Sequence, residues 1–413
     1  MSTWLVPRNE LTTEQMRAVE LSPHEHRVIL GAPGSGKTQI LLHRARYLCD
    51  AFHVAEARFH IFVFTNLLKD YIRSALQLLN LPADCVTTLD RWCSEFYRGH
   101  IGRTLPQNRA DNVPDFAAIR RAVLNTLREV AKSPGNAPRQ APFEFVLVDE
   151  GQDLDEEAFE LLKTMSKHVT VCMDHKQQIY EQGSNERQIL GRLGLRQRNV
   201  SLLAAFRCCP YVLRLAAELL EPEEAKSYLH QAQTAQIERE TPLLYRADGF
   251  EDEKRRLIEI LKVRLAKGEK IAVLLPQQRQ VHGFAKGLRE AGLEVETPRE
   301  FNFSTDLPKI MPFHSAKGLT FDTVLMPRLV LRSFAQLRED RIDRLLFVGI
   351  TRATKWVYMS TTGNSHFAPV EKLAAAESKG CLTVQLPGQG TLEWGGHDQA
   401  SKASAEDELT DLL

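Results

Sequence analysis

The stretch RVILGAPGSGKTQIL, from Arg27 to Leu41, decides the fold of the first half of this chain. Its apolar beginning predicts a short buried strand, and the residues after the last glycine predict a helix. The loop between them matches G-x-x-x-x-G-K-[ST], in which glycines allow backbone N–H groups to face a polyphosphate at a helix N-terminus. We therefore expect a phosphate-binding loop formed by Gly31, Ala32, Pro33, Gly34, Ser35, Gly36, Lys37 and Thr38.

Two side chains of this loop have expected roles. Lys37 should reach the β- and γ-phosphates, and the Thr38 hydroxyl should bind Mg²⁺. The alternative is a glycine-rich turn with an exposed lysine, which the apolar strand before the loop disfavours. The sequence thus predicts a site for a nucleoside triphosphate and Mg²⁺.

The composition limits the class of protein. A chain of 413 residues is long enough for two or three domains, of which we expect two. Lys plus Arg and Asp plus Glu both number 53, so a nucleic-acid surface would have to be local. The seven cysteines, including adjacent Cys208 and Cys209, lack C-x-x-C spacing, which indicates a reduced protein without a zinc site. With no signal peptide or membrane-spanning run, we expect a soluble cytoplasmic protein.

A pair of carboxylates follows a second apolar segment. Residues 143–148, FEFVLV, predict a buried strand that ends at Asp149 and Glu150. One carboxylate can hold the hydrated metal while its neighbour activates the attacking water, so we assign Asp149 to Mg²⁺ and Glu150 to the water. A solvated surface pair is the alternative, but such pairs rarely end a buried strand.

Two further segments predict ligand contacts at strand ends. The run RFHIFVF at 58–64 is typical of a parallel strand and leads into Thr65 and Asn66. VTTLDRW at 86–92 offers Thr88 for phosphate contact and Trp92 as a stacking face. Taken singly, Trp92 is more typical of a core residue.

Upstream of the phosphate-binding loop, residues 11–21 predict an amphipathic helix that begins at Thr12 or Thr13. Gln15 on this helix could contact an adenine edge, because an amide donates and accepts together. A solvated helix position is the plain alternative.

Taken together, these motifs resemble those of superfamily 1 DNA helicases of the UvrD/Rep/PcrA type. Beyond the phosphate-binding loop, the resemblance rests on VDEGQD at 148–153, DHKQQIY at 174–180, AAFR at 204–207, FHSAKGLTFDTVLMP at 313–327 and RLLFVGITRAT at 344–354. The motifs occur in the family's order over residues 11–361, so chance cannot explain them.

The resemblance implies roles that the residues alone would not. It implies that Gln15 reads adenine, Gln177 senses the γ-phosphate, and Phe206 stacks on the base. Arg207 and Arg352 would be arginine fingers, although each would otherwise pass for a surface arginine. It places eight residues near a bound single strand: Phe64, Thr65, Asn66, Thr88, Trp92, Tyr180, His314 and Lys317.

The sequence also departs from the family pattern. Gly151 replaces the phenylalanine of DEFQD, and Met173 replaces the glycine before Asp174. The aromatic and arginine expected after Tyr180 are missing, and Thr320 stands where a ribose-binding glutamate is usual. These changes concern the grip on the strand and the nucleotide preference rather than hydrolysis.

The alternation of apolar strands with helical stretches on both sides of Asn199 predicts an α/β fold of two domains with mainly parallel sheets, and the resemblance implies that these are tandem RecA-like domains. We place the first at residues 1–198 and the second at 199–388, followed by a disordered acidic tail at 389–413. The short intervals between Asn66 and Asp149 and between Arg207 and His314 predict that the family's large inserted domains are absent.

We expect an ATP-driven translocase or helicase on single-stranded nucleic acid, with DNA favoured over RNA and 3′ to 5′ movement implied by the resemblance. The residues do not choose between DNA repair, recombination and antiviral defence as the pathway. The alternative is a nucleotide-dependent switch subunit that regulates a partner nuclease. An inactive binding module is disfavoured because Lys37, Glu150 and Arg352 are all present.

Overall fold

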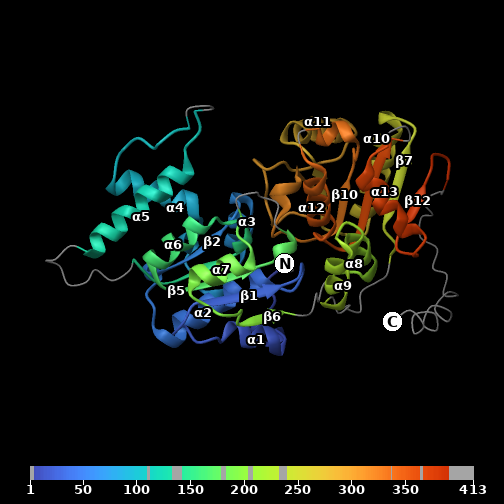
Figure 1. Ribbon diagram of the computed structural model, residues 1–413. Coiled ribbons are helices and arrows are strands. Elements are labelled where there is room, and N and C mark those ends of the chain that lie inside the picture. Colours follow the sequence, from blue (N-terminus) through green and yellow to red (C-terminus); the bar gives the residue numbers. More distant parts are fainter. Residues whose placement is uncertain are drawn as a thin grey trace.

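The computed structural model describes residues 4–108, 112–132, 142–177, 183–202, 208–231, 240–335, 337–362 and 366–389. These residues form two lobes, each built around a six-stranded sheet (Figure 1). All strand pairings within both sheets are parallel. The prediction of two α/β domains with parallel sheets is confirmed.

The first sheet has the order β3-β2-β4-β5-β1-β6. Strand β1 lies between β5 and β6, so the order of the strands in the sheet departs there from their order in the sequence. Open α/β sheets bind ligands at such a switch point, at the carboxyl ends of the strands. The strands are β1 (Arg27–Gly31), β2 (Phe59–Val63), β3 (Val86–Thr88), β4 (Phe143–Val148), β5 (Ser166–Met173) and β6 (Val200–Leu202).

Helices cover both faces of this sheet. Side chains alternate between the faces, so Ile29 packs with α2 and α3 while Val28 packs with α5 to α7. Burial on both faces explains why these strands read as continuous apolar runs. The helices are α1 (Thr13–Val19), α2 (Lys37–Phe52), α3 (Asn66–Leu76), α4 (Leu89–His100), α5 (Phe116–Lys132), α6 (Glu156–Met165) and α7 (Glu186–Leu193).

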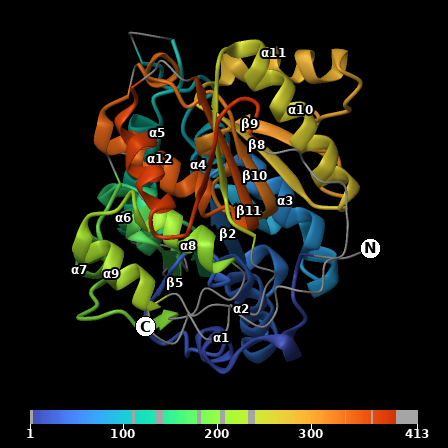
Figure 2. The same cartoon turned by 90° about the vertical axis from the view of Figure 1, so that its right-hand side faces the viewer.

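The second sheet has the order β12-β7-β11-β10-β8-β9. Its strands are β7 (Leu243–Ala247), β8 (Ile271–Leu275), β9 (Lys309–Pro312), β10 (Phe321–Met326), β11 (Ala353–Thr362) and β12 (Thr383–Gln385). Its helices are α8 (Pro210–Ala217), α9 (Pro222–Gln231), α10 (Phe250–Ala266), α11 (Gln278–Glu290), α12 (Glu339–Ile350) and α13 (Ala368–Ala374). Figure 2 shows α10 and α11 on one side of this sheet and α12 on the other.

The join between the lobes lies after β6. Strand β6 pairs with β1, so the first sheet extends beyond residue 198, where the sequence had suggested the boundary. Helix α8 packs on α12 and β11, and the Cys209 N–H donates to the Thr354 carbonyl at 2.7 Å. One apolar cluster runs from the α1–α3 face of the first domain into the second, so the lobes share packed surface. No helix among the described residues has the length and apolar character to cross a bilayer.

Candidate functional site

The phosphate-binding loop follows β1 and leads into α2. Gly34 and Gly36 have φ of +76° and +86°, a left-handed backbone that favours glycine. The buried Lys37 ammonium lies across the loop and donates to the Gly31 and Ala32 carbonyls at 2.8 and 3.1 Å. The loop therefore has the geometry of an anion site with its lysine in place.

Asp149 and Glu150 lie at the carboxyl end of β4, beside this loop. The Thr38 hydroxyl donates to Asp149 Oδ2 at 2.6 Å, and the Glu150 N–H donates to Asp149 Oδ1 at 3.0 Å. Burial and the charge of Glu150 raise the pKa of Asp149 to about 6. Glu150 has φ of +54°, a strained conformation of the kind found at functional sites.

The glycine after Glu150 is explained by packing. A Cβ atom built on Gly151 would lie 2.2 Å from Cγ1 of Val171 on β5. A side chain at position 151 would require the Val171 side chain to shift, so glycine at this position fits the close packing of the turn on β5.

Two glutamines connect the strand ends. The Gln152 amide donates to Glu150 Oε2 at 2.6 Å and accepts from the Asp174 N–H at 3.0 Å, which links the ends of β4 and β5. The Gln177 amide donates to Asp174 Oδ2 at 2.7 Å. Gln177 is therefore held in a fixed orientation beside the carboxylates.

The second domain contributes Arg352, which follows α12. Its guanidinium is 4% exposed and donates to Gln177 Oε1 at 2.6 Å, and also to the Val348 carbonyl at 3.0 Å. Arg352 and Gln177, which the resemblance assigns to the same γ-phosphate, thus meet across the domain interface.

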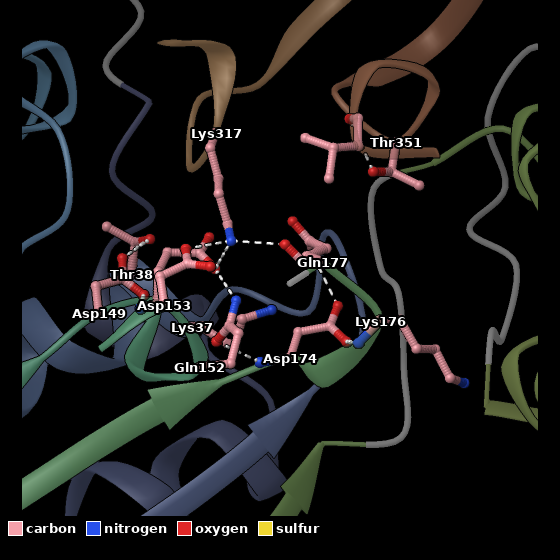
Figure 3. Close-up of polar contacts among 12 residues, drawn as sticks. Lys37, Thr38, Asp149, Gln152, Asp153, Asp174, Lys176, Gln177, Lys317 and Thr351 are labelled. Carbon is pink, nitrogen blue, oxygen red and sulfur yellow. Dashed lines mark hydrogen bonds and ion pairs between the residues drawn. The ribbon is translucent and has the colours of Figure 1, made fainter. Parts of the chain in front are cut away.

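Lys317, from the loop between β9 and β10, also crosses the interface (Figure 3). Its ammonium donates to Asp153 and to the Gln177 carbonyl and lies 3.6 Å from Glu150 Oε2. Burial alone would raise the pKa of Glu150, but the charges of Lys317, Lys37 and Arg352 outweigh burial and lower it. Lys317 is 1% exposed, so in this conformation it faces carboxylates rather than solvent.

The loop that carries Lys317 packs tightly on the first domain. A Cβ atom on Gly318 would lie 2.6 Å from Cδ2 of Leu68 on α3. Gly318 also has φ of +79°, so both conformation and space require glycine. Gly318 and Thr320 then line a narrow slot together with Lys37, Glu150 and Arg352.

Gln15 lies beside the phosphate-binding loop and is 8% exposed. Its amide oxygen accepts from the Thr12 N–H at 3.0 Å in a capping box, and its nitrogen donates to the Ser35 carbonyl at 3.0 Å. The solvated reading is therefore wrong. The amide holds the loop in position, and its contact with adenine stays a prediction.

Residues expected near a nucleic-acid strand occupy the carboxyl edge of the first sheet. Phe64 and Thr88 line one small pocket beside Asp149. Thr65 and Thr88 each cap a following helix, since their hydroxyls accept from the Leu68 and Arg91 N–H groups at 3.1 and 3.3 Å.

Three other residues of this set lie in different surroundings. Asn66 is exposed at the start of α3, and His314 is exposed near Lys317. Trp92 on α4 is half-buried and stacks on Phe96 with ring centroids 5.3 Å apart. Its indole therefore packs against the apolar cluster to which α4 and α5 contribute. Four predictions fall on residues outside the described ranges: Tyr180, Phe206, Arg207 and most of the tail.

Sequence reasoning missed several residues around the slot. Asp153 belongs to the motif VDEGQD, but the sequence assigns it no role, because its partner Lys317 is far away in the chain. Trp4, Gln39 and Tyr71 also line the slot but belong to no motif. The aromatic character of Trp4 and Tyr71 does not by itself indicate a ligand site, and only their position beside the slot draws attention to them.

Two family models match this chain. An AAA domain covers residues 15–183, and a UvrD-like helicase C-terminal domain covers residues 310–360. The first match contains the phosphate-binding loop, the carboxylates and Gln177, and the second contains Lys317 and Arg352.

Curated relatives agree with these matches. A probable DNA helicase of Mycoplasma pneumoniae is 25% identical over 268 residues, which are 57% of this chain and 47% of that protein. The ATP-dependent DNA helicase srs2 of Schizosaccharomyces pombe is 30% identical over 128 residues, 29% of this chain and 14% of that protein. The chain thus spans about half the length of the first relative and less of the second.

A solved structure, the C-terminal domain of a possible DNA helicase from Lactobacillus plantarum WCFS1, aligns with 18% identity and a TM-score of 0.35. The alignment covers 43% of this chain and 98% of that one.

Proposed function

Because the chain belongs to the UvrD-like superfamily 1 helicases, we propose that it is an ATP-driven motor that moves 3′ to 5′ along single-stranded DNA. One observation carries the proposal. Arg352 of the second domain contacts Gln177 of the first in the slot that the phosphate-binding loop lines, and Lys317 of the second domain contacts Asp153 and lies 3.6 Å from Glu150 of the first. Such a site can change with each round of hydrolysis, because a nucleotide there would touch both domains.

Glu150 acts as the base that accepts a proton from the attacking water. Its lowered pKa keeps the carboxylate ionised and able to accept a proton at neutral pH. Gln152 fixes its orientation through the hydrogen bond at 2.6 Å. Lys37 and Arg352 stabilise the charge that spreads over the transferred phosphoryl oxygens.

Thr38 and Asp149 are the residues that would hold Mg²⁺. A hydroxyl and a buried carboxylate 2.6 Å apart are hard oxygen donors of the type that Mg²⁺ prefers, so the donor set fits the ion. When bound, the ion would help to neutralise the charge of the phosphates.

Movement along the strand follows from opening and closing of the slot. Arg352 and Lys317 would lose their first-domain partners when the domains separate and regain them on closure. The predicted strand contacts Phe64, Thr65 and Asn66 lie on the first domain, at the edge nearest the carboxylates.

Measurement of ATPase activity with single-stranded DNA, duplex DNA and single-stranded RNA tests the proposal. We expect strong stimulation by single-stranded DNA and loss of turnover in Lys37→Ala, whose missing ammonium no neighbour replaces. ATPase activity that is insensitive to all three nucleic acids and responds only to a partner nuclease would favour the switch reading instead.

The short intervals between the motifs support a further expectation, that the isolated chain unwinds duplex poorly. Each base-pair step costs about 1.4 kcal/mol of stacking, and inserted domains that would press the duplex on the motor are not expected here. A duplex with a long 3′ single-stranded tail provides the assay under single-turnover conditions. Efficient strand separation by the purified chain would contradict this expectation.

A further inference from the structure

The second domain carries an apolar groove between α10 and α11, which lie side by side (Figure 2). The groove has a volume of about 500 Å³, and Phe250, Leu257, Phe284 and Leu288 provide its apolar lining. The Phe250 ring is 49% exposed and lies edge to face with Phe284, with centroids 6.5 Å apart. Among the described residues, none lines both this groove and the slot. An exposed apolar surface of this kind, away from the nucleotide site, is typical of a place where a ligand or another segment binds.

Two glycines keep the groove open on the side of α11. Gly283 and Gly287 lie inside this helix, four residues apart, and both line the groove. Of the described atoms, none lies within 4 Å of a Cβ built on Gly283, and a Cβ on Gly287 would meet Cε of Lys254 at 3.8 Å. Glycine destabilises the interior of a helix relative to alanine. Packing within the domain therefore does not require these glycines, and they leave room for a second backbone to approach.

The rim of the groove is mainly positive. Lys254, Lys286 and Arg328 line it together with one carboxylate, Glu290. Lys286 lies 3.8 Å from Glu290, and Arg328 is paired at 3.2 Å with the buried Glu253. Lys254 forms no ion pair with any described residue. A segment that carries carboxylates beside an apolar face would complement this groove in both charge and polarity.

The chain itself contains a segment of that chemistry. Residues 406–413, EDELTDLL, have four carboxylates, three leucines and no basic residue. In a helix, Leu409, Leu412 and Leu413 would share one face, with the i, i+3, i+4 spacing of helices that bind in apolar grooves. Glu406 and Glu408 would flank that face.

The last described strand, β12, lies beside α10. It pairs with β7, which leads into α10, and Gln385 is opposite Tyr245. The guanidinium of Arg256, the residue before Leu257 of the groove, donates to the Gln385 amide oxygen at 2.8 Å. Residues 390–405 separate the described chain from the acidic segment. A flexible linker of that length spans about 20–25 Å, close to the length of α10, which is about 25 Å.

We propose that the groove between α10 and α11 binds residues 406–413 of the same chain. The leucines pack against Phe250 and Phe284, and the carboxylates face Lys254 and Lys286. Because a short linker raises the effective concentration of the segment to about the millimolar range, even a weak contact is enough to fill the groove.

Fluorescence anisotropy with a labelled peptide of residues 404–413 tests this proposal on the full chain. In the wild type, the chain's own segment competes with the peptide and keeps its binding weak. We expect the peptide to bind about tenfold or more tightly to the triple variant that empties the groove: Leu409→Ser, Leu412→Ser and Leu413→Ser.

A second substitution in the triple variant locates the peptide. Gly283→Leu places a side chain in the groove and should weaken peptide binding about tenfold or more, while the helix itself is favoured by leucine. Gly191→Leu is the matched control, because Gly191 is also a helical glycine with no described atom near its Cβ position. It should leave peptide binding unchanged. Thermal unfolding and ATPase activity check that each variant is folded.

Cross-linking of ammonium to carboxylate groups with a carbodiimide identifies the occupant. In a mixture of isotopically labelled and unlabelled chains, we expect links from Lys254 or Lys286 to residues 406–411 within one copy. Links mainly between labelled and unlabelled copies would show that a second chain fills the groove and would overturn the proposal. Equal peptide affinity of the wild type and the triple variant would also overturn it. So would binding that Gly283→Leu does not weaken, or equal binding of a peptide with the same composition in scrambled order.

Discussion

The slot at the phosphate-binding loop, here called the phosphate end, and the larger pocket beside it, here called the aromatic end, differ in how they are built. At the phosphate end, charged side chains from short motifs bond to one another, as Thr38 does to Asp149 and Arg352 to Gln177. At the aromatic end, Trp4, Tyr71 and Phe303 come together from distant parts of the chain and belong to no motif. Phosphoryl chemistry requires particular groups at particular atoms, whereas stacking needs only a flat ring. The phosphate end can therefore be predicted from the sequence, whereas the grouping of the three aromatic residues is seen only in the folded structure.

Arg352→Ala tests the phosphate end most severely. We expect turnover to fall about a thousandfold or more with a small change in ATP affinity, since an arginine finger acts mainly in the transition state. Separate measurement of kcat and of nucleotide affinity checks this. Arg352→Lys is the matched variant and should recover little, because it lacks the planar fork. A loss confined to KM would mean that Arg352 is no finger.

Glu150→Gln should lower kcat by roughly a hundredfold or more while ATP still binds. The amide keeps the shape of the carboxylate and cannot accept the proton. Single-turnover hydrolysis and equilibrium binding separate the two effects. Hydrolysis at the wild-type rate would assign the base to another group and weaken the contrast between the two ends.

The pair of Lys317 and Asp153 tests whether the phosphate end also holds the domains together. Each single change, Lys317→Met or Asp153→Asn, removes one half of an ion pair between two buried side chains and should cost about 3 kcal/mol of stability. The double variant should cost clearly less than the sum of the two. Chemical denaturation of all four proteins provides the cycle. Additive losses would show that the two side chains do not interact in solution.

Gln15→Ala gives the smallest expected effect and tests whether Gln15 only holds the phosphate-binding loop or also contacts adenine. Loss of the capping box should reduce stability by about 1 kcal/mol and weaken ATP and GTP analogues equally. Thermal unfolding and binding of both analogues measure this. If only the ATP analogue binds more weakly, Gln15 reads adenine in addition to holding the phosphate-binding loop.

Local spacing explains which parts could be predicted. Lys37, Asp149 and Glu150 each follow a strand within a few residues, so the sequence alone places them at one sheet edge. The two-domain α/β fold follows from the alternation of apolar strands and helices. The pairing of strand β6 with β1 was not predicted, because its three residues carry no distinctive pattern.

The partners of Lys317 show where prediction from sequence ends. Nothing near Lys317 in the sequence indicates that its ammonium bonds to Asp153, since that contact depends on how two folded domains meet. The same holds for Phe303 against Tyr71. Contacts of this kind depend on tertiary geometry and leave no trace in local spacing.

Helix α3 runs from the predicted strand edge to the slot at the phosphate-binding loop. Its N-cap Thr65 and its first residue Asn66 lie at the predicted strand edge, Leu68 packs against Gly318 of the second domain, and Tyr71 stacks on Trp4. We expect that a strand bound at this edge would shift α3 and so alter the contacts that it makes through Tyr71 and with Gly318, two residues that line the slot. Thermodynamic reciprocity then requires that nucleotide change the affinity for the strand by the same factor as the strand changes the affinity for nucleotide. A helix of 11 residues would thus couple the affinity for the strand to the affinity for nucleotide.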